Sequence, residues 1–139
     1  MDSAAAQVRA SAIQVVRGYV EERGGAFASL LDRAGLSKDL LDDHIAIVSL
    51  ARVVDLFEVV SGYLKDPCFG LHLSAQVPPG GTGLLGKLAL SAPTAMDALR
   101  TTVLFARVFM TKVDMGCREH DGLVYTHWVL PAEITAPRL

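Results

Sequence analysis

A run of two prolines and two glycines at residues 78–81 is the feature that most constrains the fold of this chain. Two successive prolines remove two backbone N–H donors, so the segment cannot be a central strand of a sheet. It therefore interrupts the regular structure. We expect a tight turn there, after which a helix begins close against another element.

The glycines that follow resemble a dinucleotide-binding loop, since residues 81–86 read Gly-Thr-Gly-Leu-Leu-Gly. Such a loop needs a buried strand before it, a helix N-terminus for the pyrophosphate and an acidic residue about 20 positions later. The prolines exclude the strand, and the next acidic residues, Asp97 and Asp114, stand at other distances. We therefore interpret the glycines as a structural turn and expect no cofactor.

Apolar residues recur at helical spacing on both sides of this break. The spacing predicts helices over residues 5–23, 27–33, 38–42, 50–64, 67–76 and 84–89, and a further helix after Thr94. Gly24 and Gly25 end the first helix, Ser37 and Ser49 stand where caps are expected, and Thr94 with Asp97 resembles a capping box. Residues 44–48 alternate as a short strand or an extended linker would.

Two extended runs, residues 112–119 and 123–130, bracket His120-Asp121-Gly122, and Asp-Gly in this setting is a strong hairpin signal. The alternation predicts one buried face, made by Val124, Thr126 and Trp128. The other face carries Tyr125, His127 and Val129, so both faces hold apolar or aromatic side chains. Cover on both sides of the sheet, or a ligand pocket along it, would explain this. Residues 131–139 show no period and are expected to form a loop.

These elements predict an α+β fold, in which a predominantly helical N-terminal two-thirds is followed by an antiparallel β-hairpin packed on the helices. The 139 residues suffice for one domain with its own core. The hydrophobic share of 51% and the mean hydropathy of +0.36 are high for a chain whose apolar stretches fall short of the ~18 residues of a membrane span. We therefore expect apolar surface that a second protomer or a further chain covers.

The charges argue against direct nucleic-acid binding by this chain. Thirteen basic and fifteen acidic residues give a net charge of -2, and no basic cluster is available to neutralise phosphates. The first residues do not resemble a signal peptide, and Cys68 and Cys117 do not make a disulfide framework. A reducing cytoplasm is the expected location.

Metal binding and catalysis have little support in the sequence. Cys68 with His72 and Cys117 with His120 could form a four-ligand site only if their helix met the hairpin, and neither spacing matches a zinc finger. No Gly-x-Ser-x-Gly elbow occurs, and the carboxylates stand at helix ends where a structural role suffices. We expect neither a metal nor an enzyme, and a metal protein or enzyme is the weakest alternative.

A small-molecule pocket is better supported, because such a pocket needs apolar walls and a few polar anchors. The helix after Thr94 and the hairpin offer both kinds of side chain. For each candidate, packing in the core or on a solvated face is the competing interpretation. The candidate ligand-binding residues are Phe105, Arg107, Arg118, Tyr125, His127 and Trp128.

Several segments, in this order, resemble a known family. They read LDRAGL at residues 31–36, LLDD at 40–43, KDPCFGLHL at 65–73, GLLG at 83–86, SAPT at 91–94 and ALR at 98–100. Together they are similar to the N-terminal effector domain of AraC-type transcriptional regulators. The subgroup they resemble has an arabinose-binding-like domain and is typified by ornithine-utilisation regulators. The resemblance extends over residues 8–129.

The resemblance implies a two-part switch, in which this domain binds a small-molecule effector and forms a homodimer. A C-terminal helix-turn-helix domain, absent from these residues, would bind promoter DNA. Residues 1–139 would then be a single and incomplete effector-binding domain. The alternative is a pure dimerisation module without a ligand, and a cavity beside Arg118, Tyr125 or Trp128 would favour the sensing domain. Effector residues vary in this family, so the resemblance assigns none here.

Overall fold

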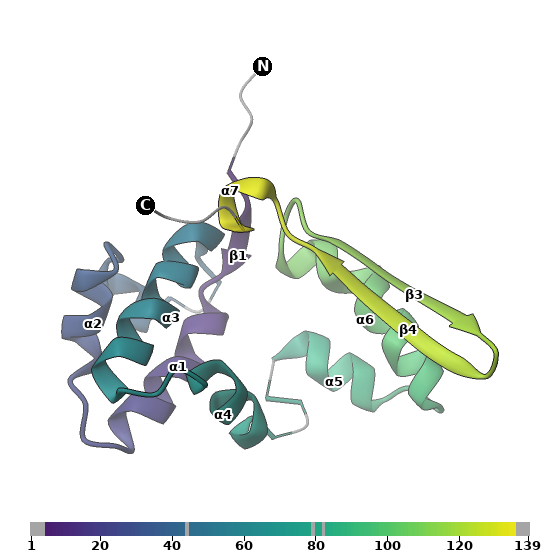
Figure 1. The fold of residues 1–139 in the computed structure, drawn as a ribbon, viewed down its shortest axis with the longest axis horizontal. Helices are drawn as coiled ribbons and strands as arrows, with labels where there is room; N and C mark the ends of the chain where they lie inside the picture. The colour runs from purple at the N-terminus through teal and green to yellow at the C-terminus, as the bar shows by residue number, and fades with distance from the viewer. Residues whose placement is uncertain (1–4, 44, 79, 82, 136–139) are drawn as a thin grey trace.

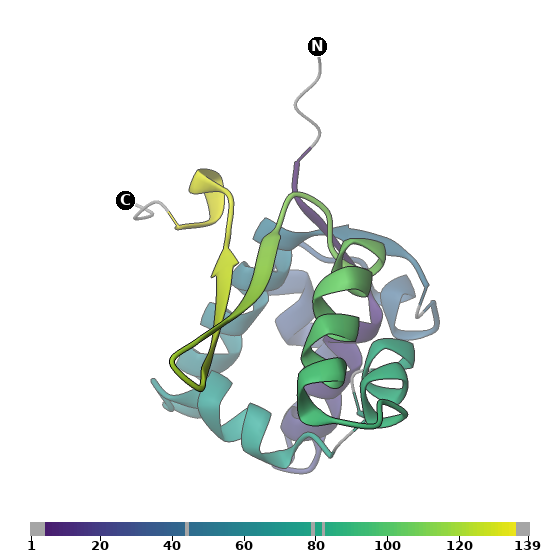
Figure 2. The ribbon, with the colours of Figure 1, turned by 90° about the vertical axis from the view of Figure 1, so that its right-hand side faces the viewer.

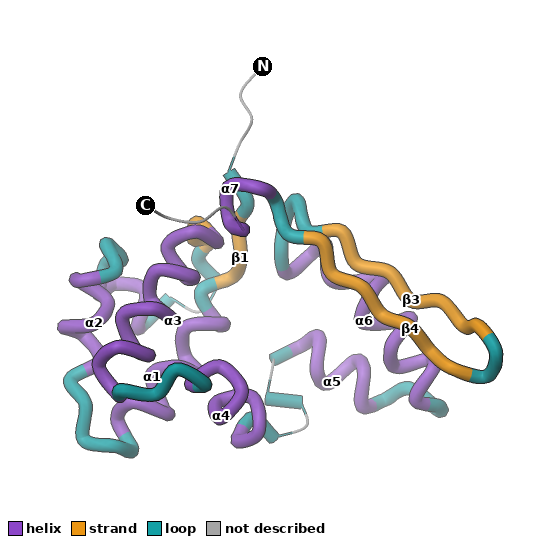
Figure 3. The backbone as a smooth tube through the Cα atoms, in the orientation of Figure 1, coloured by secondary structure: helices purple, strands orange, loops and turns teal. Residues whose placement is uncertain are grey.

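The computed structural model describes residues 5–43, 45–78, 80–81 and 83–135, and its elements form two lobes (Figure 1). The N-terminal lobe comprises β1 (Gln7–Arg9), α1 (Ser11–Glu21), α2 (Phe27–Arg33), the 3-10 helix η1 (Lys38–Leu41), β2 (Ile47–Ser49), α3 (Leu50–Leu64) and α4 (Phe69–Gln76). The C-terminal lobe comprises α5 (Leu84–Leu90), α6 (Ala95–Phe109), β3 (Asp114–His120) and β4 (Leu123–Val129). Figure 3 shows how helices dominate the first lobe and how the hairpin extends from the second. The predicted α+β fold is confirmed.

The N-terminal lobe holds nearly all of the buried apolar side chains. Phe69, at the start of α4, places its ring centroid 5.4 Å from that of Tyr19 on α1 and 5.4 Å from that of Phe57 on α3. These contacts hold α4 against α1 and α3. The largest fully buried side chains include Phe27, Leu31, Ile13, Val20, Leu56 and Val60.

The predicted helix over residues 5–23 is wrong at its start, because Gln7–Arg9 form the strand β1. β1 pairs antiparallel with β2, with Val8 opposite Val48, and α1 begins only at Ser11. Pairing with a distant segment overrides the local periodicity here. β2 confirms the short strand expected near residues 44–48, although His44 lies outside the described residues.

The turn interpretation of the glycine run is confirmed. Gly80 and Gly83 have φ values of 81° and 72°, a region that favours glycine, and the Gly81 N–H donates to the Pro78 carbonyl at 2.8 Å. Pro79 and Thr82 lie outside the described residues. α5 then begins at Leu84 and packs on α6.

The predicted helix caps are confirmed at Ser37 and Thr94. The side chain of Ser37 accepts a hydrogen bond from the Asp39 N–H at 3.2 Å. The Thr94 hydroxyl accepts from the Asp97 N–H at 3.1 Å and donates to the Asp97 carboxylate at 2.7 Å. Ser49 stands at the N-cap of α3 but makes no side-chain capping bond.

The hairpin is confirmed, with β3 and β4 paired in one unbroken register from Asp114 opposite Val129 to His120 opposite Leu123. Asp121 and Gly122 form the two-residue turn, with φ values of 51° and 73°. α6 packs against β3, so β4 is the outer strand (Figure 2). The prediction of a buried set in β4, Val124, Thr126 and Trp128, is therefore wrong, because every residue of β4 is exposed.

The predicted loop after residue 130 is wrong for Ala132–Thr135, which form the short helix α7. α7 packs on α3, and Ile134 is buried in the core of the N-terminal lobe. A helix of four residues is too short to show a period in the sequence.

The two lobes meet at a junction made by Gln7, Val8, Met110 and Thr111. Val8 forms an antiparallel bridge with Met110. The Thr111 N–H donates to the Gln7 carbonyl at 2.9 Å, and the Gln7 N–H donates to the Thr111 hydroxyl oxygen at 3.0 Å. The end of α6 is thus tied to the first strand of the chain.

Asp66, between α3 and α4, should make the free energy of unfolding depend on pH in the acid range. Its carboxylate lies 2.7 Å from His72 Nδ1 and accepts from the Cys68 N–H at 3.0 Å. The hydrogen bond with His72 lowers the pKa of Asp66 from its ordinary value of 3.8, although desolvation opposes this shift. A carboxyl with a lowered folded pKa stabilises the protein above its unfolded pKa, and this contribution is lost as the pH falls through the folded pKa.

We therefore expect the free energy of unfolding to fall below about pH 4 and Asp66→Asn to flatten this part of the profile. Urea titrations at successive pH values would measure it. Cys68→Ala keeps the backbone donor and serves as the control, with a profile like that of the wild type. An Asp66→Asn profile parallel to the wild-type curve would contradict the assignment.

Candidate functional site

The structure places the predicted ligand-binding residues in three separate regions. Phe105 and Arg107 lie on α6, where the Phe105 side chain is 41% exposed. Arg118, Tyr125 and His127 share one face of the hairpin. Trp128 lies on the opposite face, because neighbouring residues of a strand point to opposite sides. The candidates therefore do not surround one common cavity.

The hairpin face with Arg118, Tyr125 and His127 is organised by cross-strand contacts. Arg118 and Tyr125 stand directly opposite, with the guanidinium carbon 5.6 Å from the centroid of the tyrosine ring. His127 lies opposite Gly116 and covers it so closely that a Cβ at Gly116 would collide with the imidazole ring. His127 Nε2 also lies 3.7 Å from the Asp114 carboxylate. These contacts account for the polar side chains of this face without a ligand.

The other face of the hairpin points toward α6. Cys117 on this face places its sulfur 3.9 Å from the sulfur of Met96, in the first turn of α6. Trp128, opposite Met115, is on the same face but is 55% exposed. α6 therefore covers this face only in part.

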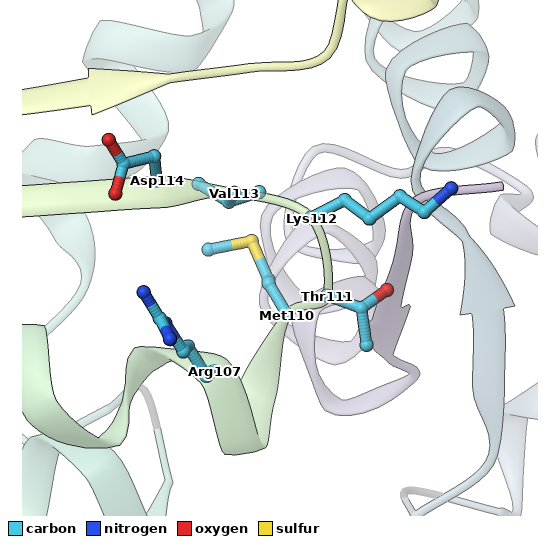
Figure 4. Close-up of a pocket in the computed structure, with 6 residues that line it drawn as sticks. All are labelled: Arg107, Met110, Thr111, Lys112, Val113 and Asp114. Carbon is cyan, nitrogen blue, oxygen red and sulfur yellow. The ribbon is translucent and has the colours of Figure 1, made fainter. Parts of the chain in front are cut away.

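A cavity of about 480 Å³ lies where α6 joins β3 (Figure 4). Its volume falls within the range of small-molecule sites, and it is open to solvent, because Arg107, Thr111, Lys112 and Asp114 are exposed. In Figure 4, Arg107 and Asp114 extend toward the same space with Met110 between them, whereas Lys112 extends the other way. The lining residues are Arg107, Met110, Thr111, Lys112, Val113 and Asp114.

The cavity combines the features that a polar ligand needs. The guanidinium of Arg107 supplies a fork of donors, the carboxylate of Asp114 supplies acceptors, and Met110 supplies an apolar wall. The last turn of α6 holds Arg107, and the first residue of β3 holds Asp114. The positive and the negative side chain of the site therefore come from two different elements, α6 and β3.

Only Arg107 of these lining residues was predicted from the sequence. Asp114 begins β3, and the others belong to the short connection between helix and hairpin, which shows no motif. Lys112 turns this connection with a φ of 57°, an unusual value for a residue other than glycine. A pair of opposite charges on either side of a short helix-to-strand connection is the signal that could have identified the site.

A second cavity, of about 310 Å³, lies between α1 and the end of α4 with the segment that follows it. Gln14 and Tyr19 on α1 face Gln76 and Pro78 across it. This cavity is smaller and has no arginine or lysine in its lining. It is thus less suited to an anionic ligand than the cavity at the α6–β3 connection.

The metal alternative needed Cys68, His72, Cys117 and His120 to converge. In the described part of the chain, no three His, Cys, Asp or Glu side chains gather as a metal site requires. His72 is instead hydrogen-bonded to Asp66, and Cys117 contacts Met96. Both cysteines are free thiols.

None of the helices in the described ranges combines the length and the apolar character that a membrane crossing demands.

Comparison with known proteins gives one family. The family described as the arabinose-binding domain of AraC transcription regulator, N-term, matches residues 24–139. The match includes every element from α2 onward, and with them the cavity and the hairpin. The chain matches no protein among the curated sequences.

Proposed function

The chain belongs to the family of arabinose-binding N-terminal domains of AraC transcription regulators, and we propose that it senses a small molecule and forms a homodimer within such a regulator. The family consists of regulatory domains and not of enzymes. The motifs at residues 65–73 and 83–86 support placing it in the ornithine-utilisation subgroup. Cytoplasmic location, and promoter binding through a helix-turn-helix domain outside these residues, belong to the same proposal.

The observation that carries the sensing role is the cavity at the α6–β3 connection. Arg107 can hold a carboxylate through paired hydrogen bonds, because its planar guanidinium matches the geometry of that group. Met110 and Val113 offer apolar contacts to the remainder of the ligand. We propose that the effector is a small carboxylic acid.

The position of the cavity supports a mechanism for signalling. Met110 and Thr111 line the cavity and also form the junction with β1. A ligand that fits one arrangement of α6 and β3 better than another shifts the population toward that arrangement. The orientation of the hairpin against the N-terminal lobe would change with it, and so would the geometry of a dimer that uses the C-terminal lobe.

Replacing Arg107 tests this site directly. Thermal-shift screening of the chain against carboxylic acids should find a ligand that raises the melting temperature. Arg107→Ala should weaken its binding by about 1.5–3 kcal/mol, because a charged hydrogen-bond donor is lost. Isothermal titration calorimetry measures the difference.

Arg100→Ala is the matched control, since Arg100 lies on α6 and its guanidinium is 3.8 Å from the Asp97 carboxylate, outside the cavity. It should bind the ligand as the wild type does. Equal binding by the wild type and Arg107→Ala would exclude this cavity as the site.

The alternative, a dimerisation module without a ligand, is favoured by the exposed apolar side chains of the C-terminal lobe. They also support the proposal that residues 1–139 form a single domain that is incomplete by itself. A dimer that responds to no carboxylic acid would favour this alternative. The exposed side chains include Leu84, Leu90, Leu104, Val108, Trp128 and Val129.

A further inference from the structure

We propose that β4 is the dimer interface, at which the outer edges of two copies pair antiparallel with Thr126 opposite Thr126 of the second copy. The product is a four-stranded sheet in the order β3, β4, β4 and β3. This inference rests on the proposed dimerisation and adds the surface and the register through which it occurs.

The hairpin register determines which backbone groups of β4 are available. A two-residue turn makes His120 and Leu123 a hydrogen-bonded pair, and bonded pairs then alternate along the ladder. The N–H and C=O groups of Leu123, Tyr125, His127 and Val129 therefore point toward β3. Those of Val124, Thr126 and Trp128 point away from it.

The outward groups face an open edge. α6 packs on the side of β3, and Figure 2 shows β4 as the outer strand of the hairpin. Within the described ranges β3 is the one strand that pairs with β4, and no backbone hydrogen bond from outside the hairpin reaches Val124, Thr126 or Trp128. An added strand would satisfy these groups directly.

β4 also lacks the features that protect an edge strand from pairing. Protected edges carry lysine, proline, a bulge or inward charges. β4 reads Leu-Val-Tyr-Thr-His-Trp-Val, with neither lysine nor proline, and its register with β3 contains no bulge. Its apolar side chains are uncovered, with Leu123 60% and Val129 56% exposed.

The sequence of β4 is complementary to itself. A two-fold axis at Thr126 aligns the whole strand, placing Val124 opposite Trp128 and Leu123 opposite Val129 of the second copy. Aromatic and branched aliphatic side chains form favourable cross-strand pairs. No two like charges meet, because His127 stands opposite Tyr125 of the second copy. The outward groups of one copy then meet those of the other, as a ladder requires.

Other registers are less favourable. A shift by one residue places the outward N–H and C=O groups of one copy opposite backbone groups of the other copy that are already bonded to β3. A shift by two residues leaves the ends of both strands unpaired. The arrangement closes at two copies as long as the other edge of β3, which pairs with no strand in the described ranges, stays unpaired; α6 packs against β3. β3 further carries the charges of Asp114, Arg118 and Glu119, so it is a poorer surface for continued pairing.

The register can be tested by placing charges at its centre. Sedimentation equilibrium should show the wild type as a dimer at high micromolar concentration. Thr126→Lys and Thr126→Glu should each weaken the dimer by about 100-fold, because two like charges meet directly across the axis. An equimolar mixture of the two variants should dimerise again, since opposite charges now face each other.

The controls separate this interface from other effects. Ser29→Lys adds the same charge on the exposed surface of α2 and should leave the dimer unchanged. Circular dichroism should show wild-type helix content in all variants, because Thr126 is exposed.

Each unfavourable result identifies what fails. A monomeric wild type would overturn both the dimerisation and this interface, and the outer edge of β4 would then not pair with a second copy. A Thr126→Lys dimer as tight as the wild type would overturn the interface alone. A mixture that stays monomeric would overturn the register, and assemblies larger than a dimer would overturn its closure. Ligand sensing at Arg107 is independent of all of these results.

Discussion

Replacing Phe69 with alanine should lower the free energy of unfolding by about 3–5 kcal/mol. The Phe69 side chain is 2% exposed and lies against the rings of Tyr19 and Phe57 at centroid distances of 5.4 Å. Truncation removes the apolar burial and both ring contacts. It also leaves a cavity where α1, α3 and α4 meet, which the surrounding helices can close only in part.

Guanidinium denaturation followed by circular dichroism measures this loss. Phe105→Ala is the matched control, because the Phe105 side chain is 41% exposed on α6 and its truncation should change stability by less than about 1 kcal/mol. Similar losses in both variants would show that the core is not concentrated in the N-terminal lobe.

Long periodic segments of the fold could be predicted from the sequence. α3 and α6 each run through several turns with one apolar stripe, and α6 begins at a Thr94 cap that is recognisable from residue types alone. β1 and α7 could not be predicted in this way. Each is short, and each forms because a distant partner covers Val8 or Ile134, which local spacing does not report.

The site was only partly predictable, for a related reason. Arg107 stands out because it lies on a recognisable helix, whereas Asp114 becomes relevant only when the chain turns at Lys112 and brings β3 beside α6. Tyr125 and Trp128 stand three residues apart in a strand, and an odd separation puts two side chains on opposite faces, so this follows from the sequence once the strand is accepted. That both side chains are exposed does not follow from the sequence, because their exposure depends on α6 packing against β3 and not against β4.

The high hydrophobic content predicts that apolar surface is exposed, but it does not predict where. A share of 51% predicts that some of this surface needs a cover. In the structure the N-terminal lobe buries most of its apolar side chains, whereas many of those on α5, α6 and β4 remain exposed. The exposed apolar surface is therefore found largely on the lobe that also carries the cavity.

Val8→Asp should have an effect as large as Phe69→Ala, because Val8 joins the two lobes. Its side chain is 4% exposed, it stands opposite Val48, and it forms the bridge to Met110. A carboxylate at this position would be buried without a partner, which lowers the free energy of unfolding by about 3–5 kcal/mol. Val108→Asp makes the same change at a side chain that is 68% exposed and should have little effect.

Hydrogen exchange distinguishes a general loss of stability from a loss of the junction. The Thr111 and Gln7 amides are protected by their mutual hydrogen bonds, and Val8→Asp should remove this protection first. The milder Val8→Ala should leave the protein folded. It should lower the protection of the same two amides from exchange, but by less than Val8→Asp does. If those amides stay protected while the rest of the protein is destabilised, the lobes are held together elsewhere, and a ligand beside Met110 and Thr111 could not signal through β1.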